Sequence, residues 1–274
     1  MSLSGKTLFI TGASRGIGLA IALRAAADGA NVVVTGKTET PHPKLPGTIH
    51  TAAEAVEQAG GRALAVPMDL REEPQVRAAV KAAVARFGGI DALVNNASAI
   101  YLTGTLDTPI RRFDLMHQVN TRGTFLATQH CLPHLLQAPN PHVLNIAPPM
   151  NLDPRWFAPH VAYTMAKYGM SLCVLGMAAE FRERGVAVNA LWPRTAIDTA
   201  AITYIAGEET RRRRTRRVEI MSDAAHAILT RPAHECTGRF FIDDDVLREA
   251  GVTDFSRYLQ DGAREEELMG DFFL

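Results

Sequence analysis

The chain has 274 residues, 47% of them hydrophobic, which is enough to bury a substantial core. Lysine plus arginine equals aspartate plus glutamate at 29 each, so no overall charge attracts nucleic acid or an acidic membrane. The three cysteines and nine histidines form no metal-ligand spacing, and we expect no metal site.

The N-terminal apolar run, Thr7 to Thr11, is too short for the hydrophobic region of a signal peptide and continues directly into a glycine loop. No stretch approaches the roughly 18 apolar residues that indicate a membrane span. We therefore expect a cytoplasmic protein that does not bind membranes.

Short runs of apolar and β-branched residues alternate with longer segments of helical periodicity, such as Pro74 to Phe87. This alternation predicts an α/β fold with a parallel sheet covered by helices on both faces. No linker divides the chain, so residues 1–274 are expected to form one domain. The expected strands are Thr7–Thr11, Asn31–Thr35, Ala63–Met68, Ala92–Asn95, His142–Ile146, Ala187–Trp192 and Arg239–Ile242.

The first strand is followed by TGASRGIG, Thr11 to Gly18, and then by a helical segment. Gly12 permits a tight turn, Gly16 lets the backbone approach a pyrophosphate, and Gly18 allows close packing of helix on strand. Amide groups at the helix start would face the anionic ligand. The loop predicts a dinucleotide site, with a flexible turn as the alternative. The expected contacts are Gly12, Ala13, Ser14, Arg15, Gly16, Ile17 and Gly18.

The second strand ends in VVVTGKT, where Gly36 and Lys37 stand in place of the carboxylate that an NAD enzyme usually has. Arg15 and Lys37 could both reach a 2′-phosphate through charge-assisted hydrogen bonds. We therefore expect NADP(H) in preference to NAD(H). The alternative makes both side chains solvated surface cations. The proline-rich segment 37–49 is interpreted as an insertion before the next helix.

The helical segment VAYTMAKYGM places Tyr163 and Lys167 four residues apart on one face. Carbonyl reduction needs a proton donor for the oxygen, and a phenol can serve if its pKa, ordinarily about 10, is drawn toward neutrality. We expect the Lys167 ammonium, helped by an oxidised nicotinamide, to lower the pKa of Tyr163. Taken alone, the pair could equally lie on an ordinary helix surface.

Three motifs in order resemble those of the short-chain dehydrogenase/reductase family: TGxxxGxG at 11–18, NNAS at 95–98 for the family's N-N-A-G, and Y-x-x-x-K at 163–167. The resemblance covers nearly the whole chain. GKTETPHPKLPGTIHTAAE, LNIAPPMNL and NALWPRTAI are similar to the hydroxysteroid dehydrogenase-like branch, without the sterol-carrier domain of some members.

The resemblance implies a single-domain Rossmann-type, doubly wound parallel sheet of about seven strands. It also implies an NADP(H)-dependent oxidoreductase that interconverts a carbonyl and a secondary alcohol on a small-molecule substrate. A homodimer or homotetramer is the expected assembly, and no nucleic acid is an expected partner.

The same resemblance implies further site residues. Asn120 would be a catalytic residue holding a water that relays protons to Lys167, and Lys167 would also bond the nicotinamide ribose. Residues 194–220 would form a lid on the substrate side. The remaining implied cofactor contacts are Asp69 and Leu70 at the adenine, Asn96 at its ribose, and Pro193 and Thr195 at the nicotinamide.

One catalytic position departs from the family. The family's substrate-orienting serine is replaced within Ala147-Pro148, and no serine or threonine lies between Ala147 and Tyr163. Losing one such donor typically costs about 3 to 4 kcal/mol of transition-state stabilisation. Asn151, a water or a backbone amide could donate instead. Otherwise the chain is a catalytically weak dinucleotide-binding protein with a sensing or assembly role.

The densest charge run is ETRRRRTRRVE, which includes Arg211 to Arg217. A solvated helical face is the expected structure, since nearby glutamates offset part of the charge. The alternative is a cationic site for a coenzyme A thioester or a carboxylate substrate. Nucleic acid is disfavoured because aromatic residues are not interleaved and the net charge is zero.

Overall fold

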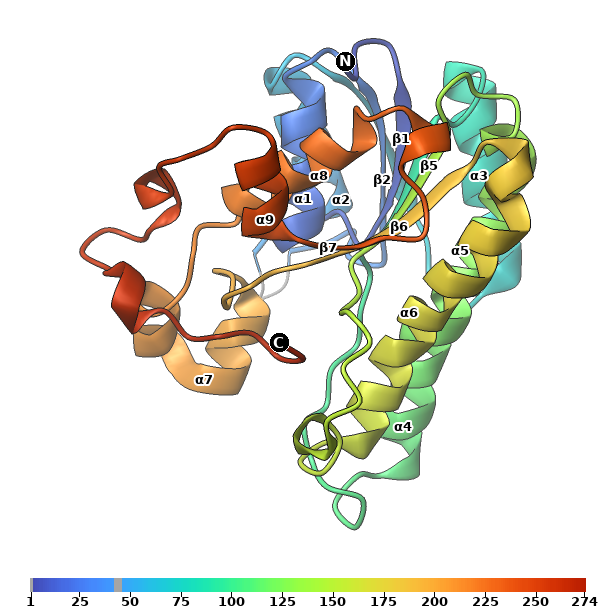
Figure 1. The fold of residues 1–274 in the computed structure, drawn as a ribbon. Helices are drawn as coiled ribbons and strands as arrows, with labels where there is room; N and C mark the ends of the chain where they lie inside the picture. Colours follow the sequence, from blue (N-terminus) through green and yellow to red (C-terminus); the bar gives the residue numbers. More distant parts are fainter. Residues whose placement is uncertain (1, 42–45) are drawn as a thin grey trace.

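A seven-stranded parallel sheet runs through the computed structural model, which describes residues 2–41 and 46–274 (Figure 1). The strand order is β3-β2-β1-β4-β5-β6-β7, which confirms the expected doubly wound sheet in one domain. The strands are β1 Thr7–Thr11, β2 Asn31–Gly36, β3 Arg62–Pro67, β4 Ala92–Asn95, β5 His142–Asn145, β6 Ala187–Trp192 and β7 Phe240–Ile242. Residues 42–45, within the expected insertion 37–49, lie outside the described residues.

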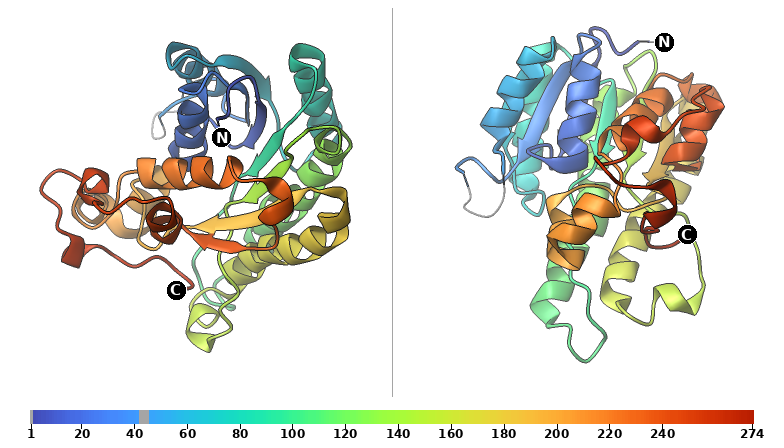
Figure 2. Two further views of the ribbon diagram at one scale, coloured as in Figure 1. Left: turned by 45° about the horizontal axis from the view of Figure 1, so that its top comes forward. Right: turned by 90° about the vertical axis from the view of Figure 1, so that its left-hand side faces the viewer.

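Helices cover both faces of the sheet (Figures 1 and 2). Buried residues of α1, α2, α8 and α9 pack on one face, and those of α3, α5 and α6 pack on the other. The helices are α1 Gly16–Ala26, α2 Ile49–Gln58, α3 Glu73–Phe87, α4 Ile110–Met116, α5 Gly123–Leu135, α6 Val161–Phe181, α7 Ala200–Arg213, α8 Glu219–Leu229 and α9 Asp243–Glu249. A π-helix, His117–Arg122, joins α4 to α5, and short 3₁₀ turns lie at Pro154–Trp156, Arg182–Arg184, Ala233–Glu235, Ser256–Tyr258 and Glu265–Glu267.

The strand order places the site. The chain leaves β1 toward β2 and β3 on one side, and returns to β4 on the other side of β1. Ligands of such sheets bind in the crevice outside the carboxyl ends of the strands at this reversal. Both β1 and β4 are buried along their whole length, as expected of central strands in a parallel sheet.

The segment after α9 returns to the carboxyl ends of the strands and ends near α7 (Figure 1). Gly270 forms an antiparallel bridge with Thr195, just after β6. The amide of Met269 donates to the carbonyl of Arg214 at 2.9 Å. We call residues 269–274 the C-terminal tail.

The helix α7 is interrupted at Gly207, whose φ of 85° is not helical. Of the arginines that follow, Arg212, Arg213 and Arg214 are exposed, as expected of a solvated helical face, whereas Arg211 and Arg216 are paired with acids of other segments. Arg211 contacts Asp198 and Glu208, and Arg216, which is 3% exposed, contacts Glu265. The expectation of a solvated helical face is therefore wrong for Arg216, which lies beyond the helix and ties it to the C-terminal segment.

No helix in residues 2–41 or 46–274 has the length and apolar character needed to cross a lipid bilayer.

Candidate active site

The glycine loop turns tightly between β1 and α1. Gly12 and Gly16 have φ of 66° and 57°, a conformation that favours glycine. A Cβ on Gly18 would lie 2.5 Å from Nδ2 of Asn96, which leaves no room for a side chain. That same Nδ2 donates to the carbonyls of Thr11 and Gly12 at 3.0 and 3.1 Å. Asn96 therefore holds the loop against the end of β4.

The start of α1 suits a phosphate. The side chain of its N-cap residue, Arg15, does not cap the helix, so it does not compete with a phosphate for the first amide groups of α1. Of the other loop residues, Ala13 and Ser14 are buried and Ile17 lines the pocket at Tyr163. Leu70 is buried against Gly123, and a Cβ added to Gly123 would lie 2.6 Å from the Leu70 side chain.

The structure brings only part of the expected 2′-phosphate site together. Arg15 donates to the carbonyls of Pro46 and Gly47 at 2.8 and 3.0 Å, so it is bound to the end of the insertion. Lys37 follows β2 directly, and its Nζ lies 3.6 Å from Oδ2 of Asp69. The Asp69 carboxylate also accepts hydrogen bonds from Arg71, which with Lys37 lowers its pKa to about 2.

Tyr163 and Lys167 lie in the first two turns of α6 and line one pocket of about 190 Å³. Both are buried, with 4% and 3% of their surface exposed. Lys167 Nζ donates to the carbonyl of Ile146 at 2.9 Å and lies 5.0 Å from the centre of the Trp192 ring. The ammonium is therefore fixed at the end of β5, beside the position of the missing serine.

The expectation that Lys167 lowers the pKa of Tyr163 is contradicted for the protein groups by themselves. Burial raises the pKa of Tyr163 well above its ordinary value, and the charge of Asp271 adds to this. Burial also lowers the pKa of Lys167 to about 8, opposed by Asp271. Burial is the largest cause of both pKa shifts, because each group loses its hydration.

Asn120 lies in the π-helix and is fully buried. Its Oδ1 accepts from the amide of Ala99 at 2.7 Å, and its Nδ2 donates to the Ala99 carbonyl at 3.0 Å. Both ends of the side chain thus bind the loop after β4, and the described lining of the Tyr163 pocket does not include it.

The structure does not bring Asn151 to the Tyr163 pocket. Its Nδ2 donates to the carbonyl of Phe273 at 3.3 Å, and its Oδ1 accepts from the amide of Asp153 at 3.1 Å. The proline segment before it is fastened to α6, where Ser171 Oγ donates to the Pro148 carbonyl at 2.7 Å. The amide of Asn151 is thus engaged by the C-terminal tail and cannot also replace the serine in this arrangement.

The loop after β6 carries the expected nicotinamide contacts. Pro193 lines the Tyr163 pocket. The hydroxyl oxygen of Thr195 is buried and has no hydrogen-bond partner in the described part of the chain. A buried unpaired hydroxyl costs free energy. Thr195 is not among the residues that line the Tyr163 pocket, so the structure does not bring this hydroxyl to the expected nicotinamide site. The main-chain amide of Arg194 donates to Oδ1 of Asp243 at 3.0 Å, which holds this loop in place.

Sequence reasoning missed the C-terminal tail. Asp271 and Phe272 line the Tyr163 pocket, and Phe273 is fully buried against the rings of Trp156, Tyr163, Tyr168 and Trp192. The only signal in the sequence is the run DFFL at 271–274, an acid followed by three large apolar residues.

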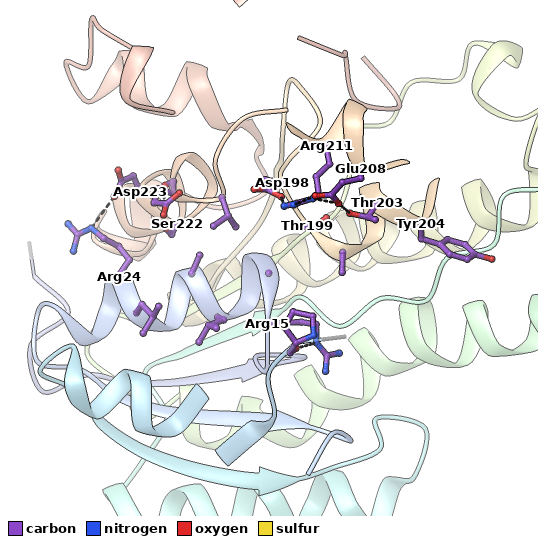
Figure 3. Close-up of a pocket in the computed structure, with 18 of the residues that line it drawn as sticks. Arg15, Arg24, Asp198, Thr199, Thr203, Tyr204, Glu208, Arg211, Ser222 and Asp223 are labelled. Atoms are coloured by element: carbon purple, nitrogen blue, oxygen red, sulfur yellow. Dashed lines mark hydrogen bonds and ion pairs between the residues drawn. The ribbon is translucent and has the colours of Figure 1, made fainter. Parts of the chain in front are cut away.

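A larger cavity of about 1130 Å³ lies between α1, α7 and α8 (Figure 3). It is lined by Arg15 and Arg24 from the α1 side and by Thr203, Tyr204 and Asp223 from the opposite side. The two cavities share Thr199. The smaller cavity is the one that holds the Tyr163–Lys167 pair.

Comparison with known proteins gives consistent matches. Residues 6–209 match the family model described as short chain dehydrogenase. The zebrafish (Danio rerio) hydroxysteroid dehydrogenase-like protein 2 is 58% identical over 272 residues, covering 99% of this chain. The chain spans only 64% of that relative's length.

Two solved structures extend the comparison. The crystal structure of a Xanthomonas campestris protein is 62% identical, with a TM-score of 0.96 and coverage of 100% of this chain and 99% of its own. A metagenomic short-chain oxidoreductase in complex with NADP is 26% identical, with a TM-score of 0.71 and coverage of 88% and 98%.

Proposed function

Because the chain belongs to the short-chain dehydrogenase/reductase family and is an oxidoreductase, we propose that it interconverts a carbonyl and a secondary alcohol with NADP(H). The observation that carries this proposal is the shared pocket of Tyr163 and Lys167, at the carboxyl ends of the strands and next to the glycine loop. Tyr163 is the proposed proton donor and acceptor.

The protonation of the pocket supports the reductive direction. A bound dinucleotide supplies the hydride. The raised pKa of Tyr163 keeps the phenol protonated at neutral pH, ready to protonate the substrate oxygen. Lys167, with a pKa lowered to about 8, is mostly charged there and stabilises negative charge that develops on that oxygen. We propose that Lys167 also bonds the nicotinamide ribose, and that Asn120 positions the loop after β4.

The proposed cofactor site extends from Lys37 and Arg15 to Pro193. The absent carboxylate after β2 supports NADP(H), as does the NADP complex of the metagenomic relative. The proposed adenine contacts are Asp69, Leu70 and Asn96, the phosphate contacts are residues 12–18, and the nicotinamide contact is Pro193.

We also propose a homo-oligomer in the cytoplasm, acting on a small molecule. Large apolar side chains are exposed along α5 and α6, among them Phe125, Met165, Leu172 and Leu175. Met165 and Leu172 are seven residues apart and so share one side of α6. An exposed apolar face of this kind is typical of a surface that another copy covers.

The alternative proposal is a catalytically weak dinucleotide-binding protein. The position of the missing serine favours it, since Ala147 is fully buried and has no side-chain donor. Sensing or assembly would then be the role of the bound dinucleotide.

Measuring NADPH consumption with a panel of ketones and aldehydes distinguishes a reductase from a catalytically weak dinucleotide-binding protein. We expect wild-type turnover on at least one carbonyl, and Tyr163→Phe should abolish it while binding of NADPH, followed by its fluorescence, is retained. The phenylalanine keeps the packing but has no proton to donate.

The matched control is Tyr258→Phe, which removes a buried tyrosine hydroxyl that is bonded to Asp223 and does not line the pocket. It should lower stability and leave turnover per folded molecule unchanged. If the wild type reduces no carbonyl, the alternative holds. If Tyr163→Phe turns over normally, the assignment of the proton donor is wrong.

A further inference from the structure

Asp271 reaches the Tyr163 pocket from the C-terminal tail. Its amide donates to the carbonyl of Arg194 at 3.0 Å, next to the bridge between Gly270 and Thr195. Its Oδ1 accepts from the amide of Phe272 at 2.7 Å. Oδ2 has no hydrogen-bond partner in residues 2–41 and 46–274, and the residue lines the pocket. One carboxyl oxygen is thus available to a ligand.

The position of this carboxyl is fixed by its neighbours. The Phe272 carbonyl accepts from Trp192 Nε1 at 2.9 Å, and Asn151 Nδ2 donates to the Phe273 carbonyl. Phe273 is fully buried, although its φ of 75° is unusual for a side-chain-bearing residue. Such a conformation persists only where the surroundings hold it, so the tail is docked firmly.

The pocket needs a second donor to the substrate oxygen. Ala147 cannot provide one, and Asn151 is bound to the tail. Asn96 is occupied with the glycine loop, and Ser98 lies at an exposed rim. Asp271, by contrast, lines the pocket together with Tyr163 and Lys167, and its ionised form would shift the pKa of both.

We propose that Asp271, as a neutral carboxylic acid, donates a hydrogen bond to the substrate oxygen in place of the missing serine. This inference rests on the proposed reductase function and deepens it. Hydride adds to the carbonyl carbon and the Tyr163 proton goes to the oxygen. Asp271 keeps its own proton, so the balance of the reaction is unchanged.

The protonation state follows from the surroundings. Burial raises the pKa of Asp271 to about 7, against the opposing effects of the hydrogen bond from the Phe272 amide and of Lys167 on α6. The Asp243 carboxylate at the start of α9 adds to the rise. Tyr163 on α6 also faces it and is neutral at that pH. Below about pH 7 the acid can donate. Above it, a carboxylate would repel the negative charge that develops on the substrate oxygen, so reduction should decline as pH rises through 7.

Two substitutions test the donor. Asp271→Asn keeps the shape and an N–H donor but does not titrate, so we expect kcat/KM within about tenfold of the wild type and no decline near pH 7. Asp271→Leu has no donor, and we expect a loss of about a hundredfold or more in kcat/KM. Asp91→Asn is the matched control, since it neutralises a half-buried acid at the opposite ends of the strands that does not line the pocket.

A carboxylate that merely orients Lys167 would make the asparagine variant as inactive as the leucine variant, and that result overturns the proposal. Wild-type activity in Asp271→Leu overturns it too. Ser98→Ala and Thr199→Ala each remove one of the two serine or threonine hydroxyls among the residues that line the pocket, and each should leave the rate within about threefold. A hundredfold loss in Ser98→Ala together with an active Asp271→Leu would assign the donor to Ser98.

A measurement without turnover keeps this test separate from that of the proposed function. The raised folded-state pKa means that the wild type loses stability as pH rises from about 4 to 7, and Asp271→Asn does not. The Tm of the variant minus that of the wild type should therefore increase over this range and stay level above it. A level difference from pH 4 to 7 contradicts a neutral Asp271, whether or not any carbonyl is reduced.

Discussion

At the scale of single residues, burial drives the ionisable groups of the Tyr163 pocket toward their neutral forms. The pKa of Tyr163 and of Asp271 is raised, and the pKa of Lys167 is lowered to about 8. A pocket with this preference penalises a charged group next to the reacting carbon. We therefore expect the preferred substrates to carry their carbonyl on an uncharged, apolar part of the molecule.

We propose that the choice of cofactor depends on Lys37, which follows β2 and whose side chain is 58% exposed. We expect Lys37→Ala to raise the KM for NADPH by about tenfold to a hundredfold, the value of one charge-assisted hydrogen bond to the 2′-phosphate. The KM for NADH should change little, because its ribose carries no such phosphate.

Steady-state kinetics with both cofactors measures this. Lys81→Ala removes an exposed cation from α3 and should change neither KM. Equal increases for NADPH and NADH in Lys37→Ala would show that Lys37 acts through its ion pair with Asp69 rather than through the phosphate.

At the scale of elements, the strands were predictable and the tail was not. Runs such as Thr7–Thr11 and Ala187–Trp192 match β1 and β6 residue for residue, because a buried parallel strand is a short run of mostly apolar residues. Tyr163 and Lys167 were also predictable, because one helix sets their spacing. Asp271 was not, since it reaches the pocket through a bridge from Gly270 to Thr195, and no local pattern encodes such a contact.

Gly18, near the start of α1, packs closely against Asn96 in the loop after β4. Gly18→Ala would place a Cβ 2.5 Å from Asn96 Nδ2 and 2.8 Å from the Gly12 carbonyl, so α1 must shift. We expect a loss of dinucleotide affinity of at least tenfold and a lower Tm, measured by titration with NADPH and by thermal unfolding.

Gly89→Ala provides the comparison, since Gly89 does not have a positive φ and no atom lies within 4 Å of a Cβ there. It should leave both quantities nearly unchanged. Unaltered dinucleotide binding in Gly18→Ala would mean that the phosphate site does not depend on this approach.

At the scale of the whole molecule, the two ends of the sheet carry different groups. The carboxyl ends of the strands hold the pocket, and the opposite ends hold a polar network. There, Asp91 accepts from the Thr7 amide at 2.8 Å, and His142 Nε2 lies 3.0 Å from the Arg231 carbonyl. His142 is 1% exposed, and burial lowers its pKa to about 4.

This histidine makes the fold sensitive to acid. Its folded-state pKa lies below the ordinary value of about 6.5, so its contribution is complete above pH 6.5 and is lost as pH falls toward 4. We expect His142→Gln to lack this loss, so that the Tm of the variant minus that of the wild type increases as pH falls from 6.5 to 4.5.

Thermal unfolding from pH 6.5 to 4.5 measures this difference in Tm. His234→Gln, which changes an exposed histidine, is the control. A constant difference would show that folding does not lower the pKa of His142.

The interruption of α7 at Gly207 divides one helix between two tasks. Ile202 and Ile205 in the first half form a wall of the catalytic pocket, and Arg211 in the second half is anchored through Asp198 and Glu208. A glycine adopts a φ of 85° without steric cost, so the chain can bend at this position. The first half of one short segment can therefore face the pocket while its second half is fastened to the loop after β6 through Asp198.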